Sequence, residues 1–223
     1  MRRNRTFRKF EDWHAHDVEQ KLGISPRMHW EAVDAWLAQA EDWPPEHEHF
    51  LERLHRNLYD SHDSWNESEL QLQFIGPLLA LVDLKGPGFA SFSQRKLSAQ
   101  LGEHHVEGCV DWITASGTYE PITPYFFLHE YKRQTGTEAS PLGQLLISML
   151  AAATLNADGK PIYGCYVLGR YWSFVLLDGQ QYGFSQGFDA LDRGELGRIW
   201  HTLRRTRELI VQRVAEELNL KQP

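Results

Sequence analysis

The stretches GCVDWIT (residues 108–114) and FFLHEYK (residues 126–132) decide how this chain is expected to fold. Both are apolar and rich in the β-branched and aromatic residues that favour strands. Each also carries one carboxylate, Asp111 or Glu130, in that apolar setting. A lone carboxylate in a buried strand is costly unless it is paired or binds a cation. We therefore expect Asp111 and Glu130 to share a site.

The alternation of side chains along a strand places Glu130 and Lys132 on one face of the second stretch. His129 then points to the other face, where we expect it to pack in the core. The strand rise sets Glu130 and Lys132 about 7 Å apart. If the two stretches are paired neighbours, Asp111 lies within about 5–6 Å of Glu130 on the same face.

Two carboxylates that converge beside a lysine have a well-defined chemical use. Carboxylate oxygens bind Mg²⁺ or Mn²⁺, and such an ion keeps several waters in its shell. The ion lowers the pKa of a bound water and offsets negative charge on a phosphate, while the lysine positions that water or stabilises developing charge. The pattern therefore predicts a divalent-cation site built from Asp111, Glu130 and Lys132.

The rest of the chain predicts helices and strands arranged around these two stretches. The helices are expected at 26–41, 46–59, 67–83, 138–156 and 189–218, and the strands at 89–101, 105–115, 124–132, 161–169, 171–178 and 181–185. Short loops between the early strands favour antiparallel pairing, whereas the helix at 138–156 favours a crossover to a parallel neighbour. We expect an α/β fold with a mixed sheet and helices on both faces.

Asp111 followed by Glu130-Tyr131-Lys132 resembles the Asp…(Asp/Glu)-x-Lys signature of the PD-(D/E)xK nuclease superfamily. The segments NESE (66–69) and FIGPLL (74–79) are similar to the opening helix of nuclease domains in type I restriction subunits. Gln144 resembles the glutamine on the helix that follows the Glu-x-Lys strand. The resemblance covers about residues 64–218, and it departs from the family at Val110, where the namesake proline is absent.

The resemblance implies a restriction-endonuclease-like, three-layer α/β/α fold with a mixed central sheet. It assigns residues 63–223 to the nuclease-like domain, and the helical pattern before them predicts an N-terminal helical extension at 1–62. It further implies Mg²⁺-dependent (or Mn²⁺-dependent) hydrolysis of DNA phosphodiester bonds, with a homodimer as one way to cut both strands.

The resemblance also implies roles for individual residues. Asp111 and Glu130 would hold the metal, Glu67 would support it, and Lys132 would be the catalytic lysine. Gln144 would act near the scissile phosphate. DNA contacts are expected from Lys132 and Arg133, which adjoin the catalytic face.

Two glutamates of the helix expected at 67–83, Glu67 and Glu69, could support the metal, and a helical projection distinguishes between them. In an unbroken helix Glu67 falls on the side of Leu70 and Phe74, facing the sheet, whereas Glu69 falls on the opposite side. Glu67 is therefore the expected residue, and Glu69 is the alternative.

Composition narrows the class of protein. The chain has 223 residues and a formal net charge of −7. This charge argues against a protein that coats nucleic acid through its overall charge, but not against an enzyme that binds nucleic acid in a local cleft. Two cysteines do not form a disulfide scaffold. No membrane-length apolar run and no phosphate-binding loop is present, so we expect a cytoplasmic protein without a membrane anchor or a nucleotide cofactor.

Two other functions stay open on the sequence. One is a catalytically inactive protein of the same fold that binds DNA or a protein partner, and the other is an acidic structural or immunity-type protein. The tryptophans near the N-terminus could stack on nucleic-acid bases, or they could pack a helical cap onto the main domain. The arginines of the last helix could contact phosphates, or they could form a solvated face. The paired histidines are expected at the surface.

Overall fold

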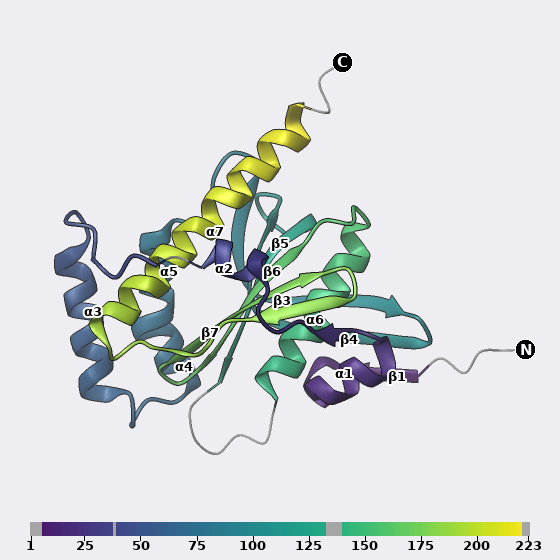
Figure 1. Cartoon of the computed structure of the whole chain (residues 1–223), viewed down its shortest axis with the longest axis horizontal. Coiled ribbons are helices and arrows are strands. Elements are labelled where there is room, and N and C mark those ends of the chain that lie inside the picture. The colour runs from purple at the N-terminus through teal and green to yellow at the C-terminus, as the bar shows by residue number, and fades with distance from the viewer. Residues whose placement is uncertain (1–5, 38, 133–139, 220–223) are drawn as a thin grey trace, which may run out of the picture.

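The computed structural model describes residues 6–37, 39–132 and 140–219. Within them a nine-stranded mixed sheet forms the centre of the molecule, with helices on both faces (Figure 1). The α/β class predicted from the sequence is confirmed.

The strands follow one another along the whole described chain. They are β1 (Thr6–Lys9), β2 (Ser25–Pro26), β3 (Phe89–Leu101), β4 (His104–Ser116), β5 (Ile122–Lys132), β6 (Ile162–Leu168), β7 (Tyr171–Asp178), β8 (Gln181–Phe184) and β9 (Phe188–Asp189). The α-helices are α1 (Ala15–Leu22), α2 (Glu31–Trp36), α3 (Glu48–Ser61), α4 (Glu67–Leu70), α5 (Gly76–Val82), α6 (Pro141–Asn156) and α7 (Arg193–Asn219).

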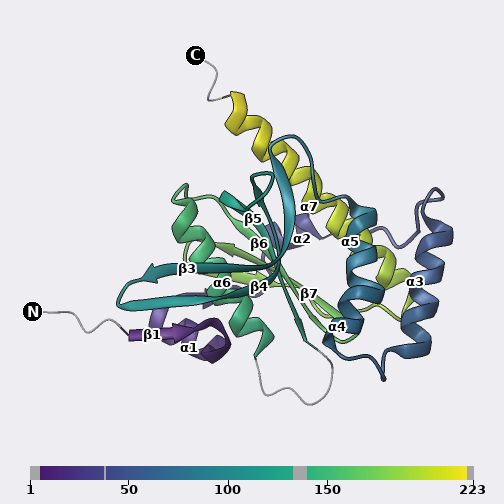
Figure 2. The same ribbon diagram turned by 180° about the vertical axis from the view of Figure 1, so that it is seen from behind.

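The sheet has the order β1-β4-β5-β6-β7-β8-β2, with β3 on β4 and β9 on β7. As predicted, β3, β4 and β5 are antiparallel neighbours, and α6 carries the chain from β5 to its parallel neighbour β6. Figure 2 shows β3 and β4 as a long ribbon that extends past the rest of the sheet toward β1 and α1.

Two hydrophobic cores, one on each face, hold the helices to the sheet. Strand β7 shows the alternation: Trp172 and Phe174 belong to one core, and Val175 and Leu177 belong to the other. The first core includes buried residues of α2, α3, α5 and α7, and the second includes those of α1 and α6. These layers fix the positions of β4, β5 and α6, which carry the candidate site.

The N-terminal region is not purely helical, which corrects the expectation for 1–62. Strand β1 pairs in parallel with β4, and β2 pairs in parallel with β8. Because Ser25–Pro26 is used as a strand, α2 covers only Glu31–Trp36 of the helix expected at 26–41. A domain division at residue 62 stays a prediction.

The helix expected at 67–83 is interrupted by a π-helical segment, Gln71–Ile75. Pro77 has no amide hydrogen, and its ring would crowd the carbonyl four residues earlier in a regular helix. The Gly76 amide donates instead to the Gln71 carbonyl, five residues back. A Cβ at Gly76 would lie 2.9 Å from that same oxygen, so this tight turn suits glycine.

The last helix, α7, packs an apolar stripe on the sheet, and two of its arginines donate to the backbone at the end of α5. The Arg204 guanidinium donates to the Val82 carbonyl and that of Arg207 to the Asp83 carbonyl, at the end of α5. None of the described helices is both long and apolar enough to cross a membrane.

Candidate active site

The site lies at a gap in the pairing of β4. Strand β3 occupies one edge of β4, and two different strands share the other edge. There β1 pairs with His104–Glu107, and β5 pairs from Trp112 onward. Residues 108–111 lie between these two pairings, and a cavity of about 370 Å³ opens beside them.

Four residues singled out in the sequence line this cavity together. Asp111 comes from β4, Glu130 and Lys132 come from β5, and Gln144 comes from α6. The expected convergence of two acids and a lysine from neighbouring strands is therefore seen in the structure. The roles of these residues in catalysis stay predictions.

Asp111 lies where the β4–β5 ladder ends. The last paired residues there are Trp112 and His129, and the next amide of β5 on that side is bonded by a side chain instead. The Asp111 Oδ2 atom accepts from the Tyr131 amide at 2.8 Å. Its Oδ1 atom accepts from the Gln94 side-chain amide at 2.7 Å, and the residue is only 9 % exposed. The carboxylate is thus held from both sides.

Gln94 is a site residue that the sequence analysis missed. It lies unpaired in β3 between Ser93 and Arg95, which are both paired with β4, and its φ of 52° is in the left-handed region. Its side-chain oxygen accepts from the Cys109 thiol at 3.3 Å while its amide donates to Asp111. The polar run SQRK at 93–96 in the middle of this strand was the signal in the sequence.

Glu130 is the most deeply buried acid of the cluster, at 1 % exposure. Burial raises its pKa well above the ordinary value, and the nearby negative charge of Asp111 raises the pKa further, against the opposing effect of Lys132. The Glu130 Oε1 atom has no hydrogen-bond partner among the described residues. An acid in this state favours any cation that can reach the cavity.

Glu67 of α4 contacts Lys132, one of the residues that line the cavity. The Lys132 Nζ atom lies 3.7 Å from Glu67 Oε2 in a half-buried ion pair. Glu69 faces away, because it forms a reciprocal capping box with Asn66 at the start of α4. Glu67 is thus the glutamate beside the lysine, as expected. The other predicted DNA contact, Arg133, lies outside the described residues.

Gln144 is positioned by the first turn of α6. The Ser140 hydroxyl caps this helix by accepting from the Gly143 amide. A Cβ at residue 143 would lie 2.3 Å from the Trp13 carbonyl oxygen, so a glycine allows α6 to meet the start of α1. The Gln144 side chain is 8 % exposed, and its Oε1 atom has no partner among the described residues.

His129 faces away from the cavity, as expected. It is fully buried, with ring centroids 4.1 Å from Phe127 and 5.7 Å from Tyr131. Burial lowers the pKa of His129 to about 3, which keeps the ring neutral at physiological pH. Its role is core packing on the opposite face of β5.

The residues at the cavity fit a hard divalent cation held largely by water. Within 6–37, 39–132 and 140–219, no group of three or more His, Cys, Asp or Glu side chains is placed so that it could hold a metal ion. Asp111 and Glu130 form a pair, and magnesium is commonly held by only one or two carboxylates plus waters. Glu130 Oε1 is unsatisfied, and the ion pair of Lys132 with Glu67 lies beside the two acids.

Other candidate residues serve the fold. Trp13, Trp36 and Trp43 are buried, which favours the packing alternative over base stacking. Arg213 donates to the Pro161 carbonyl and to Asp158, a structural use like that of Arg204 and Arg207.

Comparison of the sequence with known proteins finds no relative. No protein-family model matches the chain. No curated protein is significantly similar to it in sequence. The site is therefore interpreted from its own residues.

Proposed function

We propose that this protein is a metal-dependent nuclease of the restriction-endonuclease-like class that hydrolyses DNA phosphodiester bonds. One observation carries the proposal: Asp111, Glu130, Lys132 and Gln144 line one cavity at the gap in β4. The order of strands β3 to β5, the crossover helix α6 and the parallel strand β6 support the same class.

In this proposal Asp111 and Glu130 hold Mg²⁺ or Mn²⁺, and Glu67 supports it. When bound, the ion would supply Lewis acidity and lower the pKa of a water, and the hydrolysis would need no covalent enzyme intermediate. The hydrogen bonds from Gln94 and Tyr131 orient the Asp111 carboxylate before any substrate arrives.

Lys132 and Gln144 act on the substrate. The Lys132 ammonium, positioned by Glu67, donates to a phosphate oxygen and stabilises the charge that develops in the transition state. The Gln144 amide group, held at the start of α6, orients the scissile phosphate by a further hydrogen bond. Because both groups are fixed by packed elements, the phosphate meets them in one orientation.

DNA must approach a protein of net charge −7, so local cations are needed. Lys9 of β1 and Lys96 of β3 line the same cavity as the acids. Lys9 forms an exposed ion pair with Glu11 at 3.3 Å, whereas Lys96 has no ion-pair partner in the part of the chain that the structure describes. We assign these lysines to the phosphates that flank the scissile one.

A catalytically inactive protein of the same fold, which binds DNA or a protein, is the second candidate. It is favoured by one observation, that both Asp111 oxygens already accept hydrogen bonds from protein groups. In that case Asp111 would serve to hold β3 and β5 to β4 where the regular pairing stops, and it would need no metal.

Cleavage assays with matched variants test the proposal. Purified chain is incubated with supercoiled DNA, single-stranded DNA and RNA in Mg²⁺, Mn²⁺ or EDTA, alongside D111N, K132A and the exposed control R205A. We expect metal-dependent DNA cleavage that R205A retains and that D111N and K132A lose. Equal cleavage by the wild type and D111N contradicts the proposal, and metal-free DNA binding without cleavage supports the inactive alternative.

Two properties carried by the resemblance stay predictions: a homodimer that brings two cavities to one duplex, and a cytoplasmic location. Sedimentation of the chain with and without DNA tests the first.

A further inference from the structure

The ribbon of β3 and β4, with β1 along the other edge of β4, presents an exposed face that leads away from the cavity at β4 (Figure 2). In β3, Ser98 and Gln100 are exposed, whereas the alternating residues Leu97 and Ala99 are buried on the opposite side. The exposed positions continue across the register into β4 and β1. The resulting ribbon face has two rows of residues, Gln100–His105–Phe7 and Ser98–Glu107–Lys9.

The ribbon face is continuous with the cavity that carries the proposed active site. Lys9 and Glu107 of its second row line that cavity, together with Lys96, which is the next exposed residue along β3. His105 and Asp111 both belong to β4, and the strand rise places them about 20 Å apart. A nucleic-acid strand with one phosphate in the cavity would therefore cross the ribbon face within a few nucleotides.

An aromatic platform lies at the far end of the ribbon face. Phe7 is 56 % exposed, and its ring stacks on His105 with the centroids 5.8 Å apart and the planes inclined by 28°. The His105 Nε2 atom is hydrogen-bonded to the Ser98 hydroxyl at 3.3 Å, which holds the platform in place. An exposed ring of this kind stacks on the face of any base, whatever the sequence.

The charges on the ribbon face fit a single strand better than a duplex. Lys9 is paired with Glu11 at 3.3 Å and lies opposite Glu107 in the register, so this row has little net positive charge. Duplex DNA is bound chiefly through its phosphates, and neighbouring base pairs cover the faces of its bases. A single strand exposes its bases, so stacking on Phe7 contributes where charge attraction is weak.

We infer that the ribbon face binds a single-stranded segment of the DNA substrate, with a base stacked on Phe7 and the backbone passing Lys96 toward the cavity. The substrate class is therefore DNA with a single-stranded end or gap, rather than a continuous duplex. The inference rests on the proposed function for the position of the scissile phosphate, whereas stacking on Phe7 is measured without cleavage.

Fluorescence anisotropy in EDTA, with a labelled oligothymidylate of about 12 nucleotides, tests this surface. The wild type should bind it with a Kd of about 100 μM or lower, and the matching duplex at least about tenfold more weakly. F7A and F7L should each weaken oligothymidylate binding by at least about fivefold, because neither side chain has a ring, whereas F7Y should bind like the wild type. F7L keeps an apolar side chain in β1, so it separates loss of stacking from loss of the strand.

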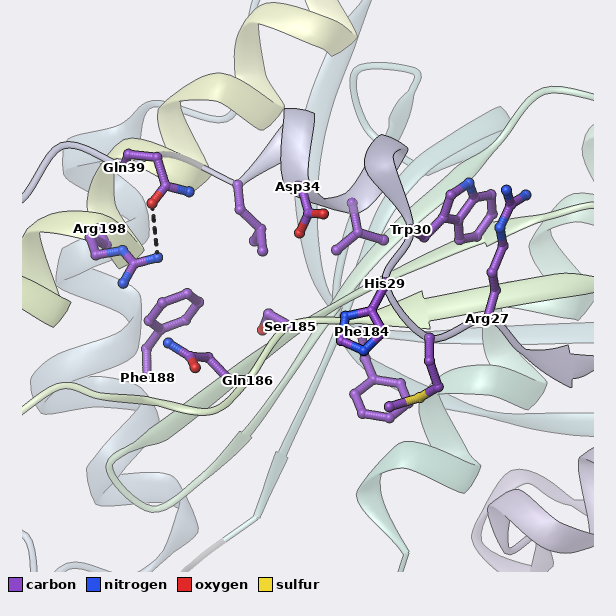
Figure 3. Close-up of a pocket in the computed structure, with 13 residues that line it drawn as sticks. Arg27, His29, Trp30, Asp34, Gln39, Phe184, Ser185, Gln186, Phe188 and Arg198 are labelled. Carbon is purple, nitrogen blue, oxygen red and sulfur yellow. Dashed lines mark hydrogen bonds between the residues drawn. The ribbon is translucent and has the colours of Figure 1, made fainter.

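Phe184 provides the matched control. It is 40 % exposed and lies at the other end of the sheet, where Figure 3 shows it at a cavity of about 430 Å³ beside β8. That cavity shares no lining residue with the cavity at β4. F184A should therefore leave the affinity for oligothymidylate unchanged.

The inference is overturned if the wild type does not bind oligothymidylate, if F7A and F7L bind it as tightly as the wild type, or if the duplex binds equally well. An equal loss of binding in F7Y or in F184A also overturns it, since the first excludes stacking and the second places the binding beside β8. Binding that depends on Phe7, in a protein that cleaves no DNA with Mg²⁺ or Mn²⁺, supports this surface and refutes the nuclease proposal alone. Cleavage that D111N abolishes, with binding independent of Phe7, refutes the surface alone.

Discussion

At the scale of single residues, ionisation of Glu130 is the electrostatically least favourable feature of the site. It is buried beside Asp111 with an unsatisfied oxygen, so its charged form is disfavoured in the folded protein. A folded-state pKa raised above the unfolded value gives stability that is complete at low pH and lost as pH rises through the folded pKa. Without metal, the folded protein is therefore penalised at neutral and alkaline pH.

The isosteric variant E130Q removes this penalty. In EDTA at about pH 8 it should raise the free energy of unfolding by on the order of 1 kcal/mol or more, and at about pH 5 the gain should shrink. Urea unfolding at the two pH values measures the difference, and E69Q is the matched control. A constant difference at both pH values would show that titration of Glu130 is not its cause.

His129 makes a second, independent pH prediction on the other face of β5. Its pKa falls from 6.5 to about 3 in the folded state, so the unfolded chain binds a proton that the folded chain does not. Stability is therefore complete above pH 6.5 and is lost as pH falls toward 3, by up to about 1.4 kcal/mol per pH unit. H129F should flatten this slope in urea unfolding, whereas H49Q, at an exposed histidine, should keep it.

At the scale of elements, the gap between β1 and β5 along β4 creates the cavity. Strand β1 ends its pairing at Glu107 and β5 begins its pairing at Trp112, so Asp111 is free to use its side chain on the Tyr131 amide. The ribbon of β3 and β4 then brings Lys96 to the cavity rim. Pairing geometry, more than any single residue, decides which side chains meet here.

The variant K96A tests the role of this ribbon in DNA binding. Because Lys96 is exposed and without a described ion-pair partner, we expect little change in stability. The KM for DNA should rise several-fold, the salt slope of log Kd should fall by about 1, and kcat should stay the same. K85A, an exposed lysine outside the cavity, is the control. A fall in kcat with unchanged salt slope would place Lys96 in the chemistry instead.

At the scale of the whole molecule, the sequence predicted the features that depend on local residue patterns. The strands β3 to β7 and the helix α6 have strong periodicity, so their order and the meeting of Asp111, Glu130, Lys132 and Gln144 could be anticipated. Strand β1 is four residues long and mostly polar, and it forms only because β4 supplies a distant parallel partner. Such non-local pairing leaves no local signal.

The details that escaped prediction are also tertiary in origin. The π-helical turn before Pro77 depends on how one backbone amide is redirected. The role of Gln94 depends on a left-handed residue within a paired strand. Neither is a property of residue type alone, so neither could be deduced from composition or periodicity.

Metal-dependent cleavage at this cavity requires Asp111 and Glu130 to act together on one divalent ion. Calorimetric titration of the metal-free protein with Mn²⁺ measures this directly, in the wild type, D111N, E130Q and the control E69Q. We expect uptake of one ion by the wild type and E69Q, with loss of at least about tenfold in affinity for D111N and for E130Q. Unchanged Mn²⁺ uptake in both D111N and E130Q, or no uptake by the wild type, would contradict it.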